Sequence, residues 1–347
     1  MKQSMPETSA PGGPQGPGAS RQAAPRRILV LGAGGFIGQR VVRALAASDW
    51  ALPVAATHRH AVELPRAIPT VRLDARDAGA LGGALAGAAG VVNCITGDAP
   101  TILASARALF AACAGAGAPR IVHLSTMMVY GSAQGMVDER APLLGDWDDY
   151  SAAKAQVETM ARACPDVVHL RPGIVYGPGS ALWSASIGRW LRAGRLGDLG
   201  AAGGGLCNLV HVDDVVAAVL SALRLPGIEG EAFNLSLPAA PTWNEYFRAY
   251  AAALGRPARP VSGGRLQREL RLYAPPLKLL QVAAGALRLA WRPPEPIRPW
   301  LLRLCRHGIG LDVRKAERVL GLHWRPLDEG LRETAAWFMA AARGGVR

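Results

Sequence analysis

The segment that most constrains the fold is a short apolar run, residues 27–31, that leads directly into a loop with glycines at positions 32, 35 and 38. Apolar residues then recur at helical spacing, at positions 41, 42, 45 and 46. A strand, a glycine turn and a helix in this order let a phosphate approach the backbone at the positive N-terminus of the helix. The pattern therefore predicts a dinucleotide-binding unit. The residues expected against the cofactor are Gly32, Gly35, Phe36, Ile37 and Gly38.

Beyond this unit, apolar runs of strand length alternate with segments of helical length. The expected strands are 52–57, 70–73, 90–95, 120–125 and 166–170, and the expected helices are 77–88, 100–115 and 149–163. Such alternation is typical of parallel βαβ units. We therefore predict an α/β fold with a doubly wound parallel sheet and a smaller, mostly helical C-terminal lobe.

The predicted organisation has a tail, a core and a lobe. Residues 1–25 are rich in Pro and Gly and lack an apolar signal-peptide segment, so we expect a disordered tail. Residues 26–175 are the expected dinucleotide-binding core, and residues 206–236 return to its sheet. We assign residues 176–205 and 237–342 to a substrate lobe over the carboxyl edge of the sheet.

A second informative pattern is Tyr150-x-x-x-Lys154, because only four lysines and six tyrosines occur among the 347 residues. Chance would produce this spacing roughly 0.07 times. Residues four apart share one face of a helix. A lysine ammonium in that place favours the phenolate of a tyrosine, and such a pair suits proton transfer to a carbonyl or from an alcohol. An exposed helical pair without a chemical role is the alternative.

The net charge of +13 is concentrated in residues 256–306, where eleven Lys and Arg accompany two acidic residues. No zinc-finger, basic-zipper or aromatic RNA-binding pattern accompanies this segment, so we expect no nucleic-acid partner. An anionic substrate, a protein partner or a weak contact with a membrane surface fits better. We expect its apolar residues to pack in the core of the smaller lobe, with a cover over an apolar substrate as the alternative. They are Leu277, Leu279, Leu280, Val282, Leu287, Leu289 and Trp291.

The five cysteines are widely spaced and include no Cys-x-x-Cys pair. We therefore expect neither disulfides nor a metal site, and we expect a reducing, cytoplasmic environment. No apolar run reaches the length of a membrane span.

With the glycine loop and the Tyr-x-x-x-Lys pattern in this order, the chain resembles the extended short-chain dehydrogenase/reductases, the NAD-dependent epimerase/dehydratase family. Six further segments are similar to motifs of that family. They are an acidic adenine contact at 71–74, an Asn-containing strand at 91–94, an active-site strand at 124–131, a loop flanking the nicotinamide at 171–178, a helix start at 210–214 and a terminal segment at 311–321. The resemblance covers about residues 26–342 and implies a catalytic Rossmann protein.

The resemblance also implies roles for the matching residues. Tyr150 is the general acid/base, and Lys154 lowers its pKa and binds the nicotinamide ribose. The hydroxyl of Thr126 polarises the carbonyl or alcohol of the substrate. The additional residues implied in cofactor binding are Asp74, Asn93, Pro172 and Val175.

The end of the second expected strand bears on the choice of cofactor. NAD-binding chains usually place an acid there for the ribose 2′-hydroxyl, but this chain has Thr57, His58 and Arg59. Arg59, helped by His58, can neutralise a 2′-phosphate. We therefore predict NADP as the cofactor, with NAD as the alternative.

Two departures from the family pattern reduce the number of reactions and substrates that the sequence favours. Dehydratases of the family carry acidic residues after the catalytic Thr, whereas Met127 and Met128 here cannot exchange protons. Many sugar-nucleotide epimerases hold the diphosphate with an Arg at the position of Cys207. A dehydratase is therefore not expected, and a nucleotide sugar is a less favoured substrate. The side chains that could replace the missing grip are Arg189, Arg192 and Arg195.

The predicted function is an NAD(P)-dependent oxidoreductase or epimerase that acts on a secondary alcohol or ketone by hydride transfer. A nucleotide-sugar epimerase is one alternative, and a non-catalytic dinucleotide-binding sensor or assembly protein is another. The expected partner is a small anionic or apolar alcohol or ketone, and a homodimer is compatible with the sequence.

Overall fold

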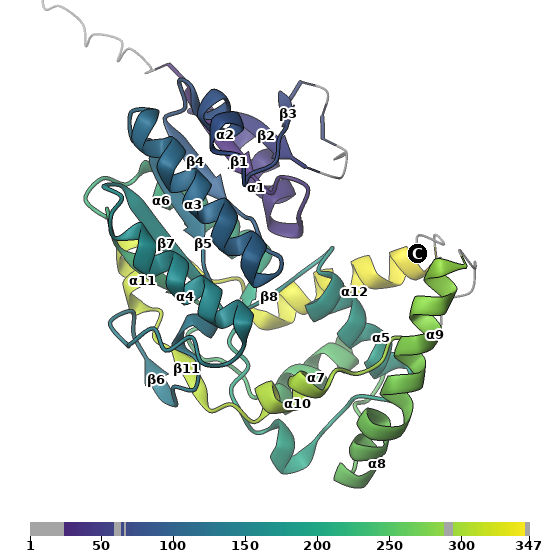
Figure 1. Ribbon diagram of the computed structural model, residues 1–347. Helices are drawn as coiled ribbons and strands as arrows, with labels where there is room; N and C mark the ends of the chain where they lie inside the picture. Colours follow the sequence, from purple (N-terminus) through teal and green to yellow (C-terminus); the bar gives the residue numbers. More distant parts are fainter. Residues whose placement is uncertain (1–23, 59–63, 66, 288–293, 344–347) are drawn as a thin grey trace, which may run out of the picture.

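The computed structural model describes residues 24–58, 64–65, 67–287 and 294–343. The predicted disordered tail, apart from its last two residues, therefore lies outside the described residues, as does Arg59. Figure 1 shows a layered α/β part, drawn in purple to teal, above a mostly helical part that contains the green helices.

A seven-stranded sheet forms the middle layer of the α/β part, in the order β3-β2-β1-β4-β5-β7-β10. Every pairing in it is parallel. The strands are β1 (Arg26–Leu31), β2 (Ala51–Thr57), β3 (Thr70–Arg72), β4 (Gly90–Asn93), β5 (Arg120–Leu124), β7 (Val167–Pro172) and β10 (Ala232–Leu235). The chain moves outward from β1 to β3 and then crosses back to β4. The strand order therefore reverses beside β1, the point at which such sheets bind ligands.

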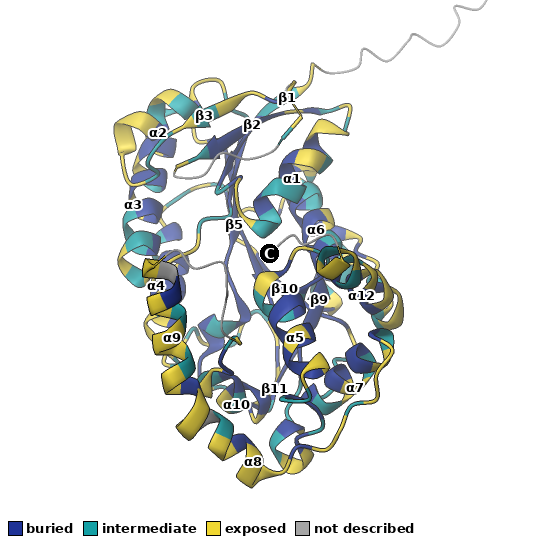
Figure 2. Ribbon diagram, turned by 90° about the vertical axis from the view of Figure 1, so that its right-hand side faces the viewer, coloured by how far each residue is buried: buried dark blue, intermediate teal, exposed yellow. Residues whose placement is uncertain are grey.

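Helices cover both faces of this sheet, which confirms the predicted doubly wound fold (Figure 2). One face carries α1 (Phe36–Ala46) and α6 (Val212–Arg224), and the other carries α2 (Ala78–Leu85), α3 (Ala99–Gly115) and α4 (Asp149–Ala161). Strands β4 and β5 are buried along their whole length. Burial from both sides is why they read in the sequence as continuous apolar runs without alternation.

Two small parallel sheets were not expected from the sequence. They pair β6 (Gly135–Val137) with β11 (Ile309–Leu311), and β8 (Ile174–Tyr176) with β9 (Leu209–His211). Three-residue strands are too short to show a period. The β8–β9 pair holds the loop after β7 beside the start of α6.

The helical part has its own apolar core, rich in aromatic side chains. Its elements are η2 (Ala181–Ser186), α5 (Ile187–Arg192), η3 (Gly200–Gly203), α7 (Trp243–Ala253), α8 (Gly263–Arg268), η4 (Glu269–Tyr273), α9 (Ala274–Ala286), α10 (Pro299–Cys305) and α12 (Leu327–Arg343). Trp190, Trp243 and Phe247 are buried at its centre. Helix α11 (Arg314–Leu320) instead packs against α6 and β10. None of the described helices has the length and hydropathy needed to cross a bilayer.

We predicted that the apolar residues of segment 277–291 pack in the core of the smaller lobe. For most of the residues in this set that the structure describes, the prediction is wrong. Leu279, Val282 and Leu287 are 71%, 59% and 69% exposed, and Leu280 is also exposed. Leu279, Leu280 and Val282 lie on α9, and Leu287 follows its last residue. Leu289 and Trp291 fall outside the described residues.

The glycine at position 38 is required by close packing between α1 and the preceding turn. A Cβ at Gly38 would overlap the carbonyl oxygen of Gly32, whereas a Cβ at the helical Gly82 would meet open space. We expect Gly38→Ala to lower the free energy of unfolding by about 1–3 kcal/mol. Gly82→Ala, the matched control, should be neutral or stabilise by up to about 1 kcal/mol. Urea unfolding of both variants checks this, and equal midpoints would contradict it.

Candidate active site

Helix α4 brings the Tyr-x-x-x-Lys pair to the carboxyl edge of the sheet. A capping box starts the helix: Asp148 Oδ1 accepts from the backbone N–H of Ser151 at 2.8 Å, and Ser151 Oγ accepts from the N–H of Asp148 at 2.9 Å. Tyr150 therefore falls in the first turn, and Lys154 lies one turn later on the same side.

Lys154 is held from below by the ends of two strands. Its Nζ donates to the carbonyl of Leu124 at 2.7 Å, at the end of β5, and to that of Ile95 at 3.4 Å, just after β4. The side chain is buried, and this burial lowers the pKa of the ammonium to about 8. A cation is thus fixed one turn beneath Tyr150.

Tyr150 lines the same cavity as Thr126 and Thr96. Hydrogen bonds with Thr126, which follows β5, and Thr96, which follows β4, lower the pKa of its phenol, but burial raises that pKa by more. The resemblance implied that Lys154 lowers the pKa of Tyr150. The structure shows a net rise, because desolvation outweighs the favourable contacts and the ammonium points to backbone carbonyls.

One turn further along α4, a buried ion pair fixes the helix to the sheet. Glu158 Oε2 pairs with Arg171 Nη2 of β7 at 2.6 Å, and both side chains are at most 5% exposed. Arg171 Nη1 also donates to the Tyr130 hydroxyl at 2.8 Å, in the short helix η1 (Met127–Tyr130). Ser125 donates to Glu158 from the end of β5. The same network therefore positions α4, β5 and the turn after Thr126.

A cavity of about 820 Å³ opens over this edge of the sheet. Thr126, Tyr150 and Lys154 line it together. Lys154 is the single Lys or Arg, and Asp148 the single carboxylate, among the lining residues, all of which belong to the described part of the chain. Much of the remaining wall is apolar or aromatic. It includes Met127, Met128, Trp147, Leu182, Trp183, Trp300 and Leu304.

The glycine loop forms the other wall of this cavity and of a second one. Gly35, Phe36, Ile37, Gly38, Pro172 and Val175 line the first cavity. The second, of about 540 Å³, adjoins it through the shared Gly35 and Thr96 and includes Gly32 and Asp74. The first turn of α1 contains no acid, and Gly35 supplies no side-chain cap. Its free N–H groups suit a pyrophosphate, so these residues fit a dinucleotide.

Asn93 and Arg59, both predicted to bind the cofactor, are not among the described residues that line the two cavities. Asn93 is buried at the end of β4, where its Nδ2 lies 3.2 Å from His123 Nδ1 and its Oδ1 accepts from the N–H of Ile95 at 3.1 Å. It shapes the loop above the sheet and is absent from the lining of both cavities. Arg59 lies outside the described residues, while His58 lines the second cavity 3.8 Å from Asp74.

Sequence reasoning missed Thr96 and the aromatic wall. Thr96 follows a buried strand at the carboxyl edge, and this position alone could have pointed to it. Trp147, Trp183 and Trp300 come from three separate segments and share no motif. Arg303 covers the outer side of Trp147, with its guanidinium carbon 3.9 Å from the ring centroid.

The three arginines considered for binding a diphosphate, Arg189, Arg192 and Arg195, do not line the cavity. Cys207 is fully buried, and Arg192 lies over the ring of Phe338. Arg189 pairs with Glu295 at 2.6 Å, and Arg195 pairs with Glu269.

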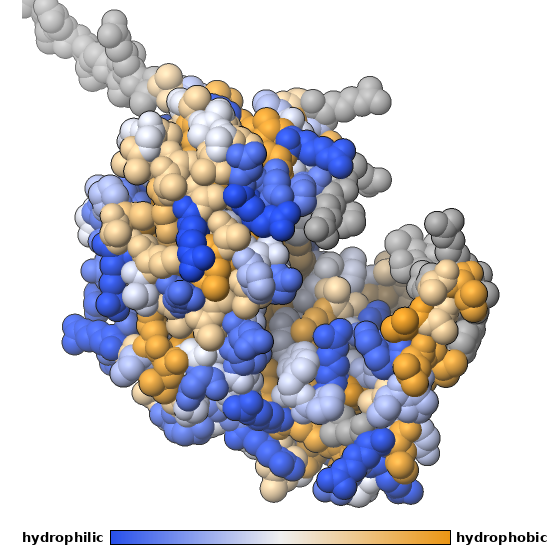
Figure 3. All heavy atoms as spheres, in the orientation of Figure 1, coloured by the Kyte–Doolittle hydropathy of each residue, from blue (hydrophilic) through white to orange (hydrophobic). Residues whose placement is uncertain are grey.

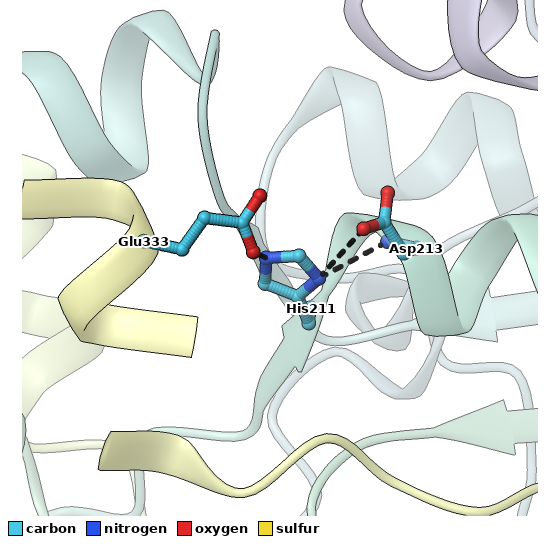
Figure 4. A group of neighbouring side chains, drawn as sticks. All are labelled: His211, Asp213 and Glu333. Atoms are coloured by element: carbon cyan, nitrogen blue, oxygen red, sulfur yellow. Dashed lines mark hydrogen bonds and ion pairs between the residues drawn. The ribbon is translucent and has the colours of Figure 1, made fainter. Parts of the chain in front are cut away.

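A separate cluster joins His211, Asp213 and Glu333 (Figure 4). The ring of His211 lies between the two carboxylates, and burial lowers its pKa to about 4, so it is neutral at pH 7. Arg325 pairs with Glu333 at 2.5 Å and with Asp213 at 3.3 Å. The Arg325 guanidinium thus pairs with both carboxylates. We therefore assign the cluster a structural role, in which it joins α12 to α6.

Residues 28–236 match the model of the NAD dependent epimerase/dehydratase family. The chain belongs to this family. It is 31% identical over 248 residues to the 2′-dehydrokanamycin reductase of Streptomyces kanamyceticus, which covers 68% of this chain and 69% of that protein.

Two solved structures show the same fold at low identity. One is a UDP-glucose 4-epimerase from Thermotoga maritima with UDP-glucose, at a TM-score of 0.69 and 21% identity over 91% of this chain and 99% of that one. The other is a double mutant of DesIV, a dTDP-glucose 4,6-dehydratase from Streptomyces venezuelae with NAD bound. It has a TM-score of 0.68 and 23% identity over 92% of this chain and 98% of that one. These two likenesses show that the chain shares its fold with both structures.

The buried pair under α4 gives a stability prediction. Glu158→Gln keeps the shape of the side chain but leaves the Arg171 guanidinium buried without its counter-charge. We expect a loss of about 3–5 kcal/mol in the free energy of unfolding. Asp328→Asn is the matched control, because its partner Arg332 is 70% exposed and such pairs contribute little. Denaturant unfolding measures both, and similar losses would refute the role given to Glu158.

Proposed function

We propose that this protein is an NADP-dependent oxidoreductase that interconverts a secondary alcohol and a ketone, with Tyr150 as the proton donor and acceptor. The observation that carries the proposal is the position of the Tyr150 hydroxyl. Tyr150 shares a cavity with Thr126 and Thr96, one helical turn from the buried Lys154, and the glycine loop lines the same cavity.

The residues present account for the proton half of the reaction. A bound nicotinamide supplies or accepts the hydride. In reduction, the phenol of Tyr150 donates its proton to the carbonyl oxygen, which Thr126 holds by a hydrogen bond. The raised pKa of Tyr150 keeps the phenol protonated at neutral pH, as a donor requires. Lys154, whose pKa of about 8 leaves it mostly charged at pH 7, stabilises the phenolate that forms.

The lining of the cavity favours an uncharged, largely apolar substrate. A nucleotide-diphosphate sugar carries two negative charges, yet Lys154 is the single lining cation among the described residues and it donates to backbone carbonyls. The methionines and tryptophans of the wall offer apolar and aromatic contact instead. This lining supports a ketone or alcohol with an apolar body over a nucleotide sugar.

Elimination and epimerisation have weaker support. Met127 and Met128 line the cavity but cannot exchange protons, and the carboxylate of Asp148 already caps α4. Epimerisation requires the substrate to present its opposite face after oxidation, whereas simple reduction needs one hydride transfer. The similarity to a reductase over 248 residues also supports reduction.

Turnover of reduced cofactor with a substrate panel tests the function. We expect activity with bulky apolar ketones and none with UDP- or dTDP-sugars. Tyr150→Phe should lower kcat by at least about 100-fold without weakening cofactor binding, because it removes only the proton donor. Tyr273→Phe, at an exposed tyrosine, is the control and should be unchanged. Epimerisation of a UDP-sugar, or full activity in Tyr150→Phe, would overturn the proposal.

Direct titration tests the proposed preference for NADP. Neither Thr57, the last residue of β2, nor His58 after it is acidic. An acid there would repel a 2′-phosphate, and Arg59 adds a positive charge next in the sequence. We expect NADPH to bind about 10-fold or more tightly than NADH, as one charge-assisted hydrogen bond provides. Arg59→Ala should remove most of this difference. Equal or tighter binding of NADH would show that NAD is the cofactor.

A further inference from the structure

Exposed apolar side chains concentrate on one segment of the molecule. Of the nine large hydrophobic residues that are exposed in the described chain, six lie within residues 272–287. They are Leu272, Tyr273, Leu279, Leu280, Val282 and Leu287. Soluble proteins scatter such residues singly, and a contiguous group marks an interaction surface. Figure 3 shows orange, hydrophobic spheres along the right-hand rim of the molecule, where Figure 1 places α9.

These side chains share one face of a continuous helical arm. The arm comprises α8, η4 and α9, which follow one another without a break from Gly263 to Ala286. Leu279 and Leu280 follow Leu272 by seven and eight residues. Leu287 in turn follows Leu280 by seven residues. These separations are the spacing of one helical face. The opposite face is the one that packs, since Ala274 and Ala284 are buried.

The start of the arm is firmly attached to the helical part. Leu266 is buried, and Arg265 donates to the carbonyl of Gly194 at 2.8 Å. Glu269 pairs with Arg195 in a half-buried position. In Figure 1 the arm runs along the outer side of the helical part, with α9 at its edge. These contacts fix the start of the arm, and α9 continues from it as a helix.

The charge on the arm is of one sign. Arg265, Arg268, Arg271 and Lys278 are exposed, and the one acid among residues 256–287, Glu269, is already paired. A helix with a wide apolar face and basic side chains around it is the pattern that lies in the interface of an anionic bilayer. A second copy would instead bring its own basic side chains against these, at a cost in like-charge repulsion.

We propose that the arm formed by α8, η4 and α9 docks the protein onto the surface of a membrane that contains anionic lipid. The apolar side chains enter the boundary between headgroups and acyl chains, and Arg268, Arg271 and Lys278 contact the lipid phosphates. This docking does not depend on the proposed reaction, because it uses a surface outside the cavity.

Sedimentation of the full chain with vesicles tests the docking. The vesicles contain phosphatidylcholine alone or with about one third phosphatidylglycerol, in the range of natural anionic membranes. We expect binding to the anionic vesicles that weakens as salt rises. Leu279→Glu should weaken it by about 10-fold or more, since one leucine no longer enters the apolar layer. Arg271→Glu with Lys278→Glu should abolish the preference for anionic vesicles.

Met136→Glu is the matched control, because Met136 is 65% exposed but lies on β6, away from the arm. It should bind vesicles like the unaltered chain, and unfolding midpoints should show that all variants fold. Absence of the chain from the anionic vesicle pellet at low salt would overturn the proposal, as would equal binding by Leu279→Glu. A self-association that Leu279→Glu disrupts, without vesicle binding, would identify a second copy as the occupant. Because no turnover is measured, failure here leaves the proposed reaction untouched.

Discussion

The buried pair between Glu158 and Arg171 is the interaction on which the rest of the site depends. It ties α4 to β7 with both side chains at most 5% exposed, and Arg171 extends the connection to Tyr130 in η1. The helix that carries Tyr150 and the turn that follows Thr126 are therefore fixed to one another through the sheet. An isolated buried ion pair rarely adds net stability. This one instead determines where three elements meet, so its main effect is on geometry.

Burial sets the chemistry of the site as much as charge does. Desolvation raises the pKa of Tyr150 and lowers that of Lys154 to about 8, so the two pKa values move apart. A phenol that stays protonated above a cation that stays charged is suited to giving up a proton as an alkoxide forms. The carbonyl of Leu124, at the end of β5, and that of Ile95, just after β4, keep the cation in place.

The sequence was sufficient to predict the sheet, the glycine loop and the convergence of Thr126, Tyr150 and Lys154, because each depends on local spacing and on the meeting of parallel strand ends. It could not reveal the sign of the change in the pKa of Tyr150, which depends on how deeply the folded chain buries the phenol. Nor could it show that Leu279 and Leu287 face outward, since helical periodicity defines a face without saying what covers it. Glu158 escaped notice because its partner, Arg171, lies on another element.

The three tryptophans of the cavity wall belong to segments that enter the site from different directions. Trp147 precedes α4, Trp183 lies in η2, and Trp300 lies in α10. The strand ends and α4, which carry the proposed reacting groups, do not contribute to this aromatic wall. Relatives that share the scaffold can therefore exchange the wall residues one at a time and accept differently shaped molecules while keeping the same proton transfer. In this architecture, the evolution of specificity is separated from the evolution of catalysis.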